Sequence, residues 1–348
     1  LWRRWRVPQV RFIYHDIYGQ TLSGTPVDAM RGEKILGFLV DEGLLDRDDI
    51  SIPRQPPVRS LLRVHDSDYL DAVGNDAEVT ERIFGERISD ADVEQLIELQ
   101  RVAVGGTIQA TRLALHSRSI AINLGGGFHH ASRSQGMGFC VFNDVAVAIA
   151  RLRAKGFKEP ILVIDLDLHD GNGTREIFAR DSTVYTYSVH NHHWGETAAE
   201  ASTAIALGDD VADEVYLGTL LKTLPDAMMQ VEPGLVIYVA GTDPAYDDNL
   251  GNWRITADGM FRRDRWVREL MQHARRRRPL VIVLAGGYGS GAWRYSARFF
   301  SWLIAGKVSK TPDNAEMILR RFRRIRSSIN PSDLTAEPLE YGWRLSEE

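Results

Sequence analysis

Two acids and a histidine follow directly on an apolar run in the middle of the chain. Residues 161–164 read Ile-Leu-Val-Ile, as expected of a strand buried on both faces. Asp165, Asp167 and His169 come next at intervals of two, so on a continuing strand all three side chains project to one side. Such a group is costly to bury unless a cation binds it. The mixed oxygen and nitrogen donors favour zinc or a similar first-row metal.

The glycines after this motif predict a tight turn. Gly171 and Gly173 would let the backbone wrap closely around the metal. An alternative interpretation stays open, in which the acids at the strand end cap the next helix and bind no metal.

The composition is that of an ordinary globular protein. The chain has 348 residues, 44% hydrophobic and 26% charged, enough for one large α/β domain or two average ones. The formal net charge of −5 argues against a dedicated nucleic-acid binder. The single cysteine, Cys140, excludes an internal disulfide and is typical of a reducing compartment, so we expect a cytoplasmic protein. No apolar run reaches the roughly 18–20 residues that a membrane span needs.

Apolar strand patterns alternate with helical patterns along the chain. Strands are predicted at 10–14, 119–123, 161–167, 183–189, 234–240 and 280–285, and helices at 31–45, 66–73, 92–116, 144–154, 213–230, 258–278 and 292–305. This alternation requires a parallel sheet with right-handed crossovers and helices on both faces. The fold class is therefore α/β.

Polar side chains gather where these predicted strands end. They are His129 and His130, the Asp167/His169 pair, Asp243 and Tyr288. In open α/β sheets the ligand site lies outside the carboxyl ends of the strands, so four segments are expected to meet at one edge. Six of the ten histidines lie between positions 129 and 193, which a random scatter of core histidines would not produce.

The gathered residue types suit metal-assisted hydrolysis. A hydrolytic zinc site needs three protein ligands, and Asp243 is the best candidate for the third. Zinc lowers the pKa of a bound water towards about 7 and polarises a carbonyl. The His129–His130 pair can serve as general base and acid, and Tyr288 can donate to a developing oxyanion. Asp165 can orient and tune one imidazole.

Five motifs in this order resemble the zinc-dependent histone deacetylases of the arginase/deacetylase superfamily. They are Gly125-Gly-Gly-Phe-His-His130, Gly138-Phe-Cys-Val-Phe-Asn-Asp144, Asp165-Leu-Asp-Leu-His-Asp-Gly-Asn-Gly173, Ala240-Gly-Thr-Asp243 and Gly286-Gly-Tyr288. The resemblance covers about residues 10–306. Gly105-Gly-Thr-Ile108 and Asp248-Asn-Leu-Gly251 look most like the class IV branch and its bacterial relatives. The resemblance to the superfamily implies a three-layer fold, with a mainly parallel sheet between helices.

The resemblance also implies a role for each site residue. Zinc would bind Asp167, His169 and Asp243; His130 would shuttle protons, with Asn172 contacting it; His129 would pair with Asp165; and Tyr288 would polarise the carbonyl. The acyl-lysine tunnel would be lined by Gly138 and Phe139, facing Leu250 and either Trp194 or His193. A neutral Asn172, where some relatives have aspartate, implies a less basic imidazole.

Two potassium sites are a further implication of the resemblance. The first would use Asp165, Asp167, His169, Ser188 and Val189, partly through backbone carbonyls, and the second would lie near Phe178, Asp181 and Val184. Asp170 departs from the family pattern, because many relatives have histidine or glutamine there.

The end of the chain lies outside this resemblance. We expect a catalytic domain over 1–306 and a basic helix with a tail over 307–348. Residues 318–326 are basic and amphipathic, which favours a surface helix packed on the domain, although binding to a membrane surface or an anionic partner stays open.

We therefore expect a zinc hydrolase that removes acetyl or longer acyl groups from lysine side chains of proteins or peptides. The alternatives are an acetylpolyamine or other small-molecule amidohydrolase, a dinuclear manganese ureohydrolase, and a metal-bound acyl-lysine binding module without turnover. The sequence leaves the acyl length, the natural substrate and the oligomeric state open.

Overall fold

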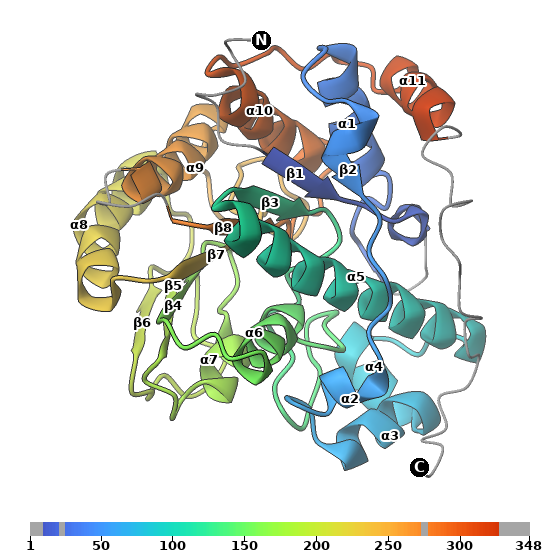
Figure 1. Cartoon of the computed structure of the whole chain (residues 1–348), viewed down its shortest axis with the longest axis vertical. Coiled ribbons are helices and arrows are strands. Elements are labelled where there is room, and N and C mark those ends of the chain that lie inside the picture. Colours follow the sequence, from blue (N-terminus) through green and yellow to red (C-terminus); the bar gives the residue numbers. More distant parts are fainter. Residues whose placement is uncertain (1–9, 21–24, 273–277, 327–348) are drawn as a thin grey trace.

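One parallel sheet forms the centre of the computed structural model, which describes residues 10–20, 25–272 and 278–326. Its strands are β1 (Val10–Ile13), β2 (Ile50–Ser51), β3 (Ile120–Asn123), β4 (Ile161–Asp165), β5 (Val184–His190), β6 (Ser202–Ala206), β7 (Leu235–Val239) and β8 (Leu280–Val283). They lie in the order β2-β1-β3-β8-β7-β4-β5-β6, and every neighbouring pair is parallel (Figure 1).

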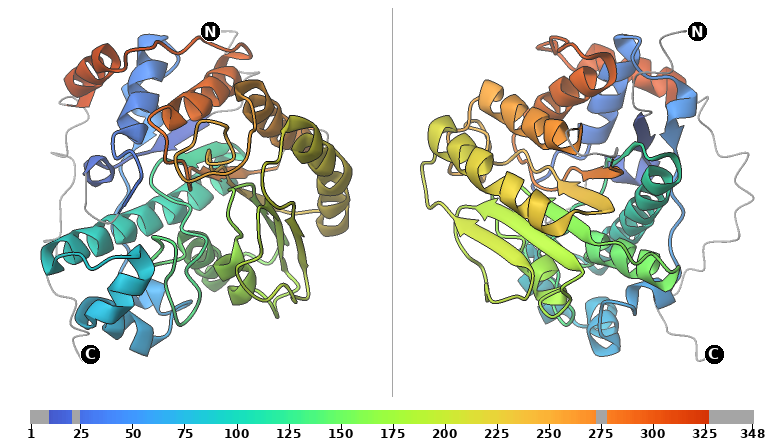
Figure 2. Two further views of the ribbon diagram at one scale, coloured as in Figure 1. Left: turned by 180° about the vertical axis from the view of Figure 1, so that it is seen from behind. Right: turned by 60° about the vertical axis from the view of Figure 1, so that its left-hand side comes forward.

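Helices cover both faces of this sheet (Figure 2). They are α1 (Arg31–Asp41), α2 (Val58–Leu61), α3 (Ser67–Asn75), α4 (Ala77–Phe84), α5 (Asp90–Ser117), α6 (Asp144–Ala154), α7 (Asn172–Ile177), α8 (Asp213–Val231), α9 (Ala257–Gln272), α10 (Ala292–Ala305) and α11 (Glu316–Arg326). Within the described ranges, no helix is long and apolar enough to cross a membrane.

The central strands are apolar on both faces, and their alternation builds two separate cores. Leu162 and Ile164 of β4 pack in a core with α1, α8, α9 and α10. Ile161 and Val163 point the other way, into a core with α3, α4, α5 and α6. Each fully buried aliphatic side chain contributes about 1.5–3 kcal/mol, so this pattern fixes the register of β4. The predicted α/β fold with three layers is confirmed.

The structure adds elements that the sequence patterns did not indicate. Strands β2 and β6 are short edge strands, and β6 is only partly buried, so neither carries a strong apolar pattern. Helix α7 occupies the segment that was expected to be a glycine turn. The predicted helix over 258–278 is α9 up to Gln272, and residues 273–277 lie outside the described part.

Helix α11 lies against α1 at one end of the molecule (Figure 1). Its Ile318 and Phe322 are fully buried, and a Cβ on Gly37 of α1 would come within 2.6 Å of Ile318. Arg326 reaches the buried Glu33 of α1 at 3.3 Å. The basic amphipathic segment is thus packed on the domain by its apolar face, while residues 327–348 of the expected tail lie outside the described residues.

Candidate active site

Four adjacent strands, β3, β8, β7 and β4, deliver the polar side chains to one edge of the sheet. His129 and His130 follow β3, Tyr288 follows β8, Asp243 follows β7, and Asp165 is the last residue of β4. The four segments come from distant parts of the sequence, but their strands are neighbours. This is the edge at which open α/β sheets bind ligands.

The three proposed metal ligands lie close together. The carboxylate oxygens of Asp167 and Asp243 and a ring nitrogen of His169 lie within 4.8 Å of one another. Nδ1 of His169 lies 3.2 Å from Asp167 Oδ1 and 2.9 Å from Asp243 Oδ2. Both carboxylates are almost completely buried. Two carboxylates and an imidazole at this spacing suit a metal ion such as zinc.

The electrostatics of the group also fit a cation. Burial and the charge of Asp167 raise the pKa of Asp243 to about 7. Burial lowers the pKa of His169, but its hydrogen bonds to Asp167 and Asp243 outweigh this effect and raise the pKa to about 10. The two carboxylates therefore draw positive charge into the site. A divalent metal would satisfy both acids and leave the imidazole neutral.

The backbone that carries Asp167 and His169 is not the continuing strand that the spacing predicted. Strand β4 ends at Asp165, so alternation along a strand does not explain how Asp167 and His169 point. Instead, backbone amides orient the acid: His169 N and Gly286 N donate to Asp167 at 3.0 and 2.8 Å. At Gly171, the missing Cβ makes room for Asp165 Oδ2, 2.3 Å from the ideal Cβ position.

The missing side chain of Gly173 makes room for the backbone of the histidine segment. A Cβ there would lie 2.4 Å from the carbonyl oxygens of His130 and Ala131. The glycine lets the start of α7 approach the histidine pair, and Asn172 on the same turn reaches that pair. The short helix therefore connects the metal segment to the two histidines.

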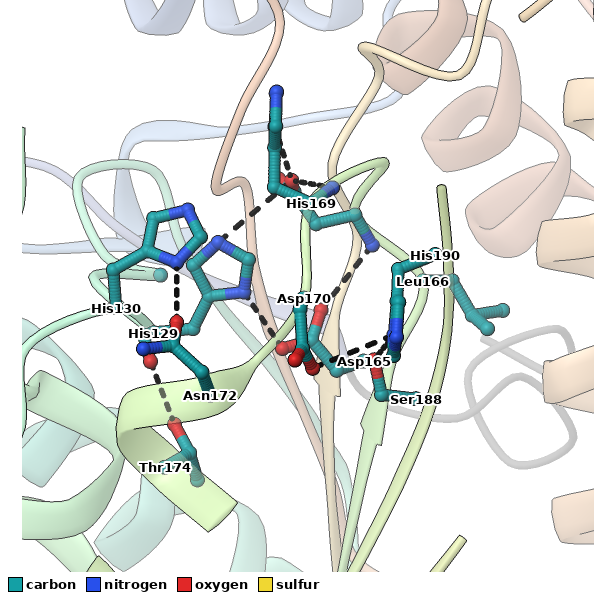
Figure 3. A network of polar contacts seen from close by, with 12 residues as sticks. His129, His130, Asp165, Leu166, His169, Asp170, Asn172, Thr174, Ser188 and His190 are labelled. Atoms are coloured by element: carbon teal, nitrogen blue, oxygen red, sulfur yellow. Dashed lines mark hydrogen bonds and ion pairs between the residues drawn. The ribbon is translucent and has the colours of Figure 1, made fainter. Parts of the chain in front are cut away.

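The two histidines have different hydrogen-bond partners (Figure 3). His129 Nδ1 donates to Asp165 Oδ2 at 2.7 Å, while His130 Nδ1 donates to the amide oxygen of Asn172 at 2.8 Å. Burial lowers the pKa of His129, but Asp165 and Asp167 outweigh it and raise the pKa to about 9. Burial and the adjacent His129 lower the pKa of His130 well below its usual value. At neutral pH one imidazole is charged and the other is neutral.

Tyr288 stands on a turn that is fixed from several sides. Arg31 donates to the carbonyls of Ala285 and Gly286 at 2.7 and 2.9 Å, and Asp248 accepts the Tyr288 amide at 2.7 Å. Gly287 has a φ of 134°, and a Cβ there would lie 2.1 Å from Thr242. Burial and the charges of Asp243 and Asp167 raise the pKa of Tyr288 well above its usual value. The phenol therefore stays protonated and can donate.

Three of the four expected tunnel residues lie against the site. A Cβ on Gly138 would come within 2.5 Å of the His130 ring. Phe139, 6.3 Å from the Tyr288 ring, holds an unusual positive φ of 66°, a strain that is common at functional sites. Trp194 stacks on His130 with ring centroids 4.3 Å apart and planes 6° apart.

Leu250 is placed differently from the other tunnel residues. It is 48% exposed on the loop that holds the Tyr288 turn through Asp248. His193, the alternative to Trp194, turns away and pairs with His190 at 2.9 Å.

Asp170, the departure from the family pattern, forms a buried ion pair. Its two oxygens accept from Arg175 at 2.5 and 2.6 Å, and one also accepts the Trp194 amide at 3.1 Å. Arg175 in turn donates to the carbonyl of Glu196 at 3.0 Å. The pair thus fixes the segment that stacks Trp194 on His130.

Asp170, His190 and His193 also lie close enough to hold a metal ion. However, the guanidinium of Arg175 already neutralises Asp170 and would repel a second cation. This cluster shares no residue with Asp167, His169 and Asp243, whereas a dinuclear centre places its two ions about 3.5–4 Å apart. The ion pair with Arg175 therefore disfavours this cluster as a second metal site.

The residues expected around potassium fall in two places. Asp165 and Ser188 are paired across β4 and β5, and Ser188 Oγ lies 2.7 Å from His190 Nδ1. Phe178, Asp181 and Val184 form a tight turn, in which the carbonyls of Phe178 and Asp181 each accept one backbone amide. Each of these two carbonyl oxygens keeps a second lone pair.

A cavity of about 130 Å³ lies next to the site. His129, His130 and Tyr288 form part of its wall, so it opens from the reacting groups. Its apolar lining includes Tyr18, Val27, Leu96, Leu99, Leu124 and Phe139. Sequence reasoning missed Arg31 at this cavity, because a single arginine in a helix has no local pattern that marks it.

Comparisons with known proteins agree with this arrangement. A family model described as the histone deacetylase domain matches residues 25–302. The chain is 33% identical over 311 residues to histone deacetylase 2 of Arabidopsis thaliana, covering 83% of this chain and 77% of that protein. It is 26% identical over 323 residues to the acetoin utilization protein AcuC of Staphylococcus aureus, covering 86% and 80%.

A solved structure shows the same fold. The crystal structure of a histone deacetylase homologue from Aquifex aeolicus superposes with a TM-score of 0.75 at 26% identity, covering 90% of this chain and 88% of that one. Because the family model matches most of the sequence, a range that includes every motif of the site, the chain belongs to the histone deacetylase family.

Proposed function

We propose that this chain is a zinc-dependent hydrolase that removes acyl groups from lysine side chains of proteins or peptides. One observation carries the proposal: a three-residue metal site, a neutral histidine and a protonated tyrosine converge at one sheet edge, beside an apolar cavity. Within the family, the motifs Gly105-Gly-Thr-Ile108 and Asp248-Asn-Leu-Gly251 support a place in the class IV branch.

Asp167, His169 and Asp243 are the proposed zinc ligands. Zinc in such a site supplies an activated water and polarises the substrate carbonyl. The Tyr288 hydroxyl donates a hydrogen bond to the carbonyl oxygen as negative charge develops on it. Gly138, Phe139 and Trp194 are the proposed walls of the passage for the acyl-lysine side chain.

His130 is the proposed proton carrier. Because its Nδ1 donates to Asn172, its Nε2 lone pair is free to take a proton from the attacking water. The same nitrogen then gives the proton to the leaving amine. His129, held as a cation by Asp165, stabilises the negative charge nearby. Potassium at the two predicted positions would brace β4 and β5 behind these groups.

The histidine roles predict unequal losses. His130→Ala is expected to lower kcat/KM by about 10²–10⁴, the range for general acid–base catalysis, and His129→Ala by less. Both variants are assayed on one acyl-peptide at one pH, with zinc content checked in each. Similar residual rates would contradict this division of labour.

A small-molecule amidohydrolase is the second candidate, because the chain also resembles AcuC along most of its length. It would use the same residues on a small substrate such as an acetylated polyamine. Turnover of acetylspermidine without turnover of acyl-peptides would favour it. A binding module without turnover is less well supported, since such a site has no need for the complete set of His130, His129 and Tyr288.

The cavity supports a preference for long acyl chains. A decanoyl group has eight more methylenes than acetyl, each worth about 0.8 kcal/mol when it leaves water. The guanidinium of Arg31, which also borders the cavity, is occupied by two carbonyls, so its charge is partly satisfied. We therefore expect decanoyl-lysine to exceed acetyl-lysine in kcat/KM by about tenfold or more in the same peptide.

A cavity-filling variant provides the control. Ala29 borders the cavity and belongs to none of the proposed catalytic groups. Ala29→Phe is expected to reduce decanoyl turnover and to leave acetyl turnover within a few-fold of the unmodified chain. A clear advantage of acetyl over decanoyl in the unmodified protein would rule out the long-chain preference.

A further inference from the structure

Arg263 of α9 lies next to the metal-binding segments without contributing a ligand. Its side chain is completely buried, and its Nε donates to Asp264 Oδ1 at 2.8 Å. Tyr238 of β7 donates to the same carboxylate oxygen at 2.5 Å. A fully buried arginine is rare unless it is paired and hydrogen-bonded. Asp264 accepts from only some of the N–H groups of Arg263.

One terminal nitrogen of Arg263, Nη1, bridges two backbone segments at the point where β4 and β7 separate. The last ladder hydrogen bond between these strands joins Leu166 N to Val239 O at 3.0 Å. Beyond it, Nη1 of Arg263 donates to Leu166 O at 3.1 Å and to Gly241 O at 2.7 Å. The guanidinium thus replaces the sheet hydrogen bonds that end there.

These two carbonyls lie immediately before the metal ligands. Leu166 directly precedes Asp167, and Gly241 stands two residues before Asp243. One rigid, planar group therefore holds the bases of both carboxylate-bearing segments at a fixed separation. Metal sites require their ligands to be held within about 0.5 Å of the productive geometry.

We infer that Arg263 is a positioning residue that sets the affinity of the site for its metal. The inference rests on the proposed zinc site. Loss of a group that orients metal ligands typically costs about 10–100-fold in metal affinity. Because Arg263 acts through the backbone, its loss is expected to weaken metal binding while the ligands themselves remain.

The test removes both members of the buried pair. Arg263→Met alone would leave Asp264 buried without a cation, which is strongly destabilising. In the double variant Arg263→Met/Asp264→Asn, the asparagine can still accept from Tyr238. The Kd for Zn²⁺ is measured by chelator competition, and folding of the metal-free proteins by urea unfolding. The Kd is expected to rise about 10–100-fold relative to the unmodified chain.

Tyr238→Phe is the matched control, since it disturbs the same buried network but leaves both carbonyl contacts of Arg263 intact. It is expected to change the Kd by less than threefold. An unchanged Kd in the double variant, or an equal rise in Tyr238→Phe, would overturn the inference. A failure of the unmodified chain to bind Zn²⁺ would instead refute the proposed function.

Arg263→Lys keeps the test decisive if the double variant does not fold. Lysine retains the charge beside Asp264 but lacks the planar fork that serves both carbonyls and the carboxylate together. Its Kd for Zn²⁺ is expected to rise at least threefold. A folded Arg263→Lys protein with the affinity of the unmodified chain would contradict the positioning role.

Discussion

Asp243→Ala is expected to abolish tight zinc binding and, with it, turnover. Asp243 is one of three proposed ligands, and its carboxylate lies 2.9 Å from the His169 ring nitrogen. The variant would leave two ligands, so the loss of affinity should exceed the roughly 100-fold that is typical when only a supporting group is removed. Metal content after dialysis against a mild chelator measures the effect directly.

Two further variants test whether the loss of zinc binding comes from the missing carboxylate of Asp243. Asp243→Asn keeps the shape and an oxygen that can accept from Leu168 N, but it removes the charge. It should bind zinc better than Asp243→Ala and worse than the unmodified chain. Asp210→Ala removes an exposed acid paired with Arg254 and should bind zinc normally. Full zinc occupancy in Asp243→Ala would show that the ligand assignment is wrong.

Much of the fold follows from patterns within short segments. Both faces of β4, β7 and β8 are covered, so these strands read as unbroken apolar runs, and polar residues mark where they end. Parallel strands bring their carboxyl ends to one edge, so residues as far apart as His129 and Tyr288 could be expected to meet. The edge strand β6 lacks such a run, because only part of it is buried.

The supporting contacts of the site were not predictable in this way. Arg31 binds the Gly286 carbonyl across 255 positions, and Arg263 binds the Leu166 carbonyl across 97. Nothing in the sequence around either arginine indicates its partner, because that partner is a backbone carbonyl in a distant segment. The same holds for Asp170, whose role depends on Arg175 and on the Trp194 amide.

The spacing of polar residues along the chain did not predict how the side chains of the proposed ligands are oriented. The spacing of two between Asp165, Asp167 and His169 suggested one face of a strand, but the strand ends at the first of them. Amide donors from other segments then orient the acids, as Gly286 N does for Asp167. The residue types identified the chemistry, whereas the geometry came from contacts between segments.

Tyr288→Phe is expected to keep the fold and the metal but to lower kcat by about 10²–10³, the usual loss for one oxyanion donor. The phenylalanine ring retains the packing of Tyr288 beside Phe139 and His169, at centroid distances of 6.3 and 6.4 Å. Only the hydroxyl is lost.

The expected loss falls on kcat because the hydroxyl acts mainly as charge develops on the carbonyl oxygen. The Tyr288 turn is held by Arg31 and Asp248 in the free protein, so the donor needs little reorganisation to reach that oxygen. Tyr246→Phe, at a tyrosine that is 62% exposed, is the matched control and should leave kcat unchanged. A Tyr288→Phe protein with normal zinc content and kcat within a few-fold of the unmodified chain would remove this hydroxyl from the mechanism.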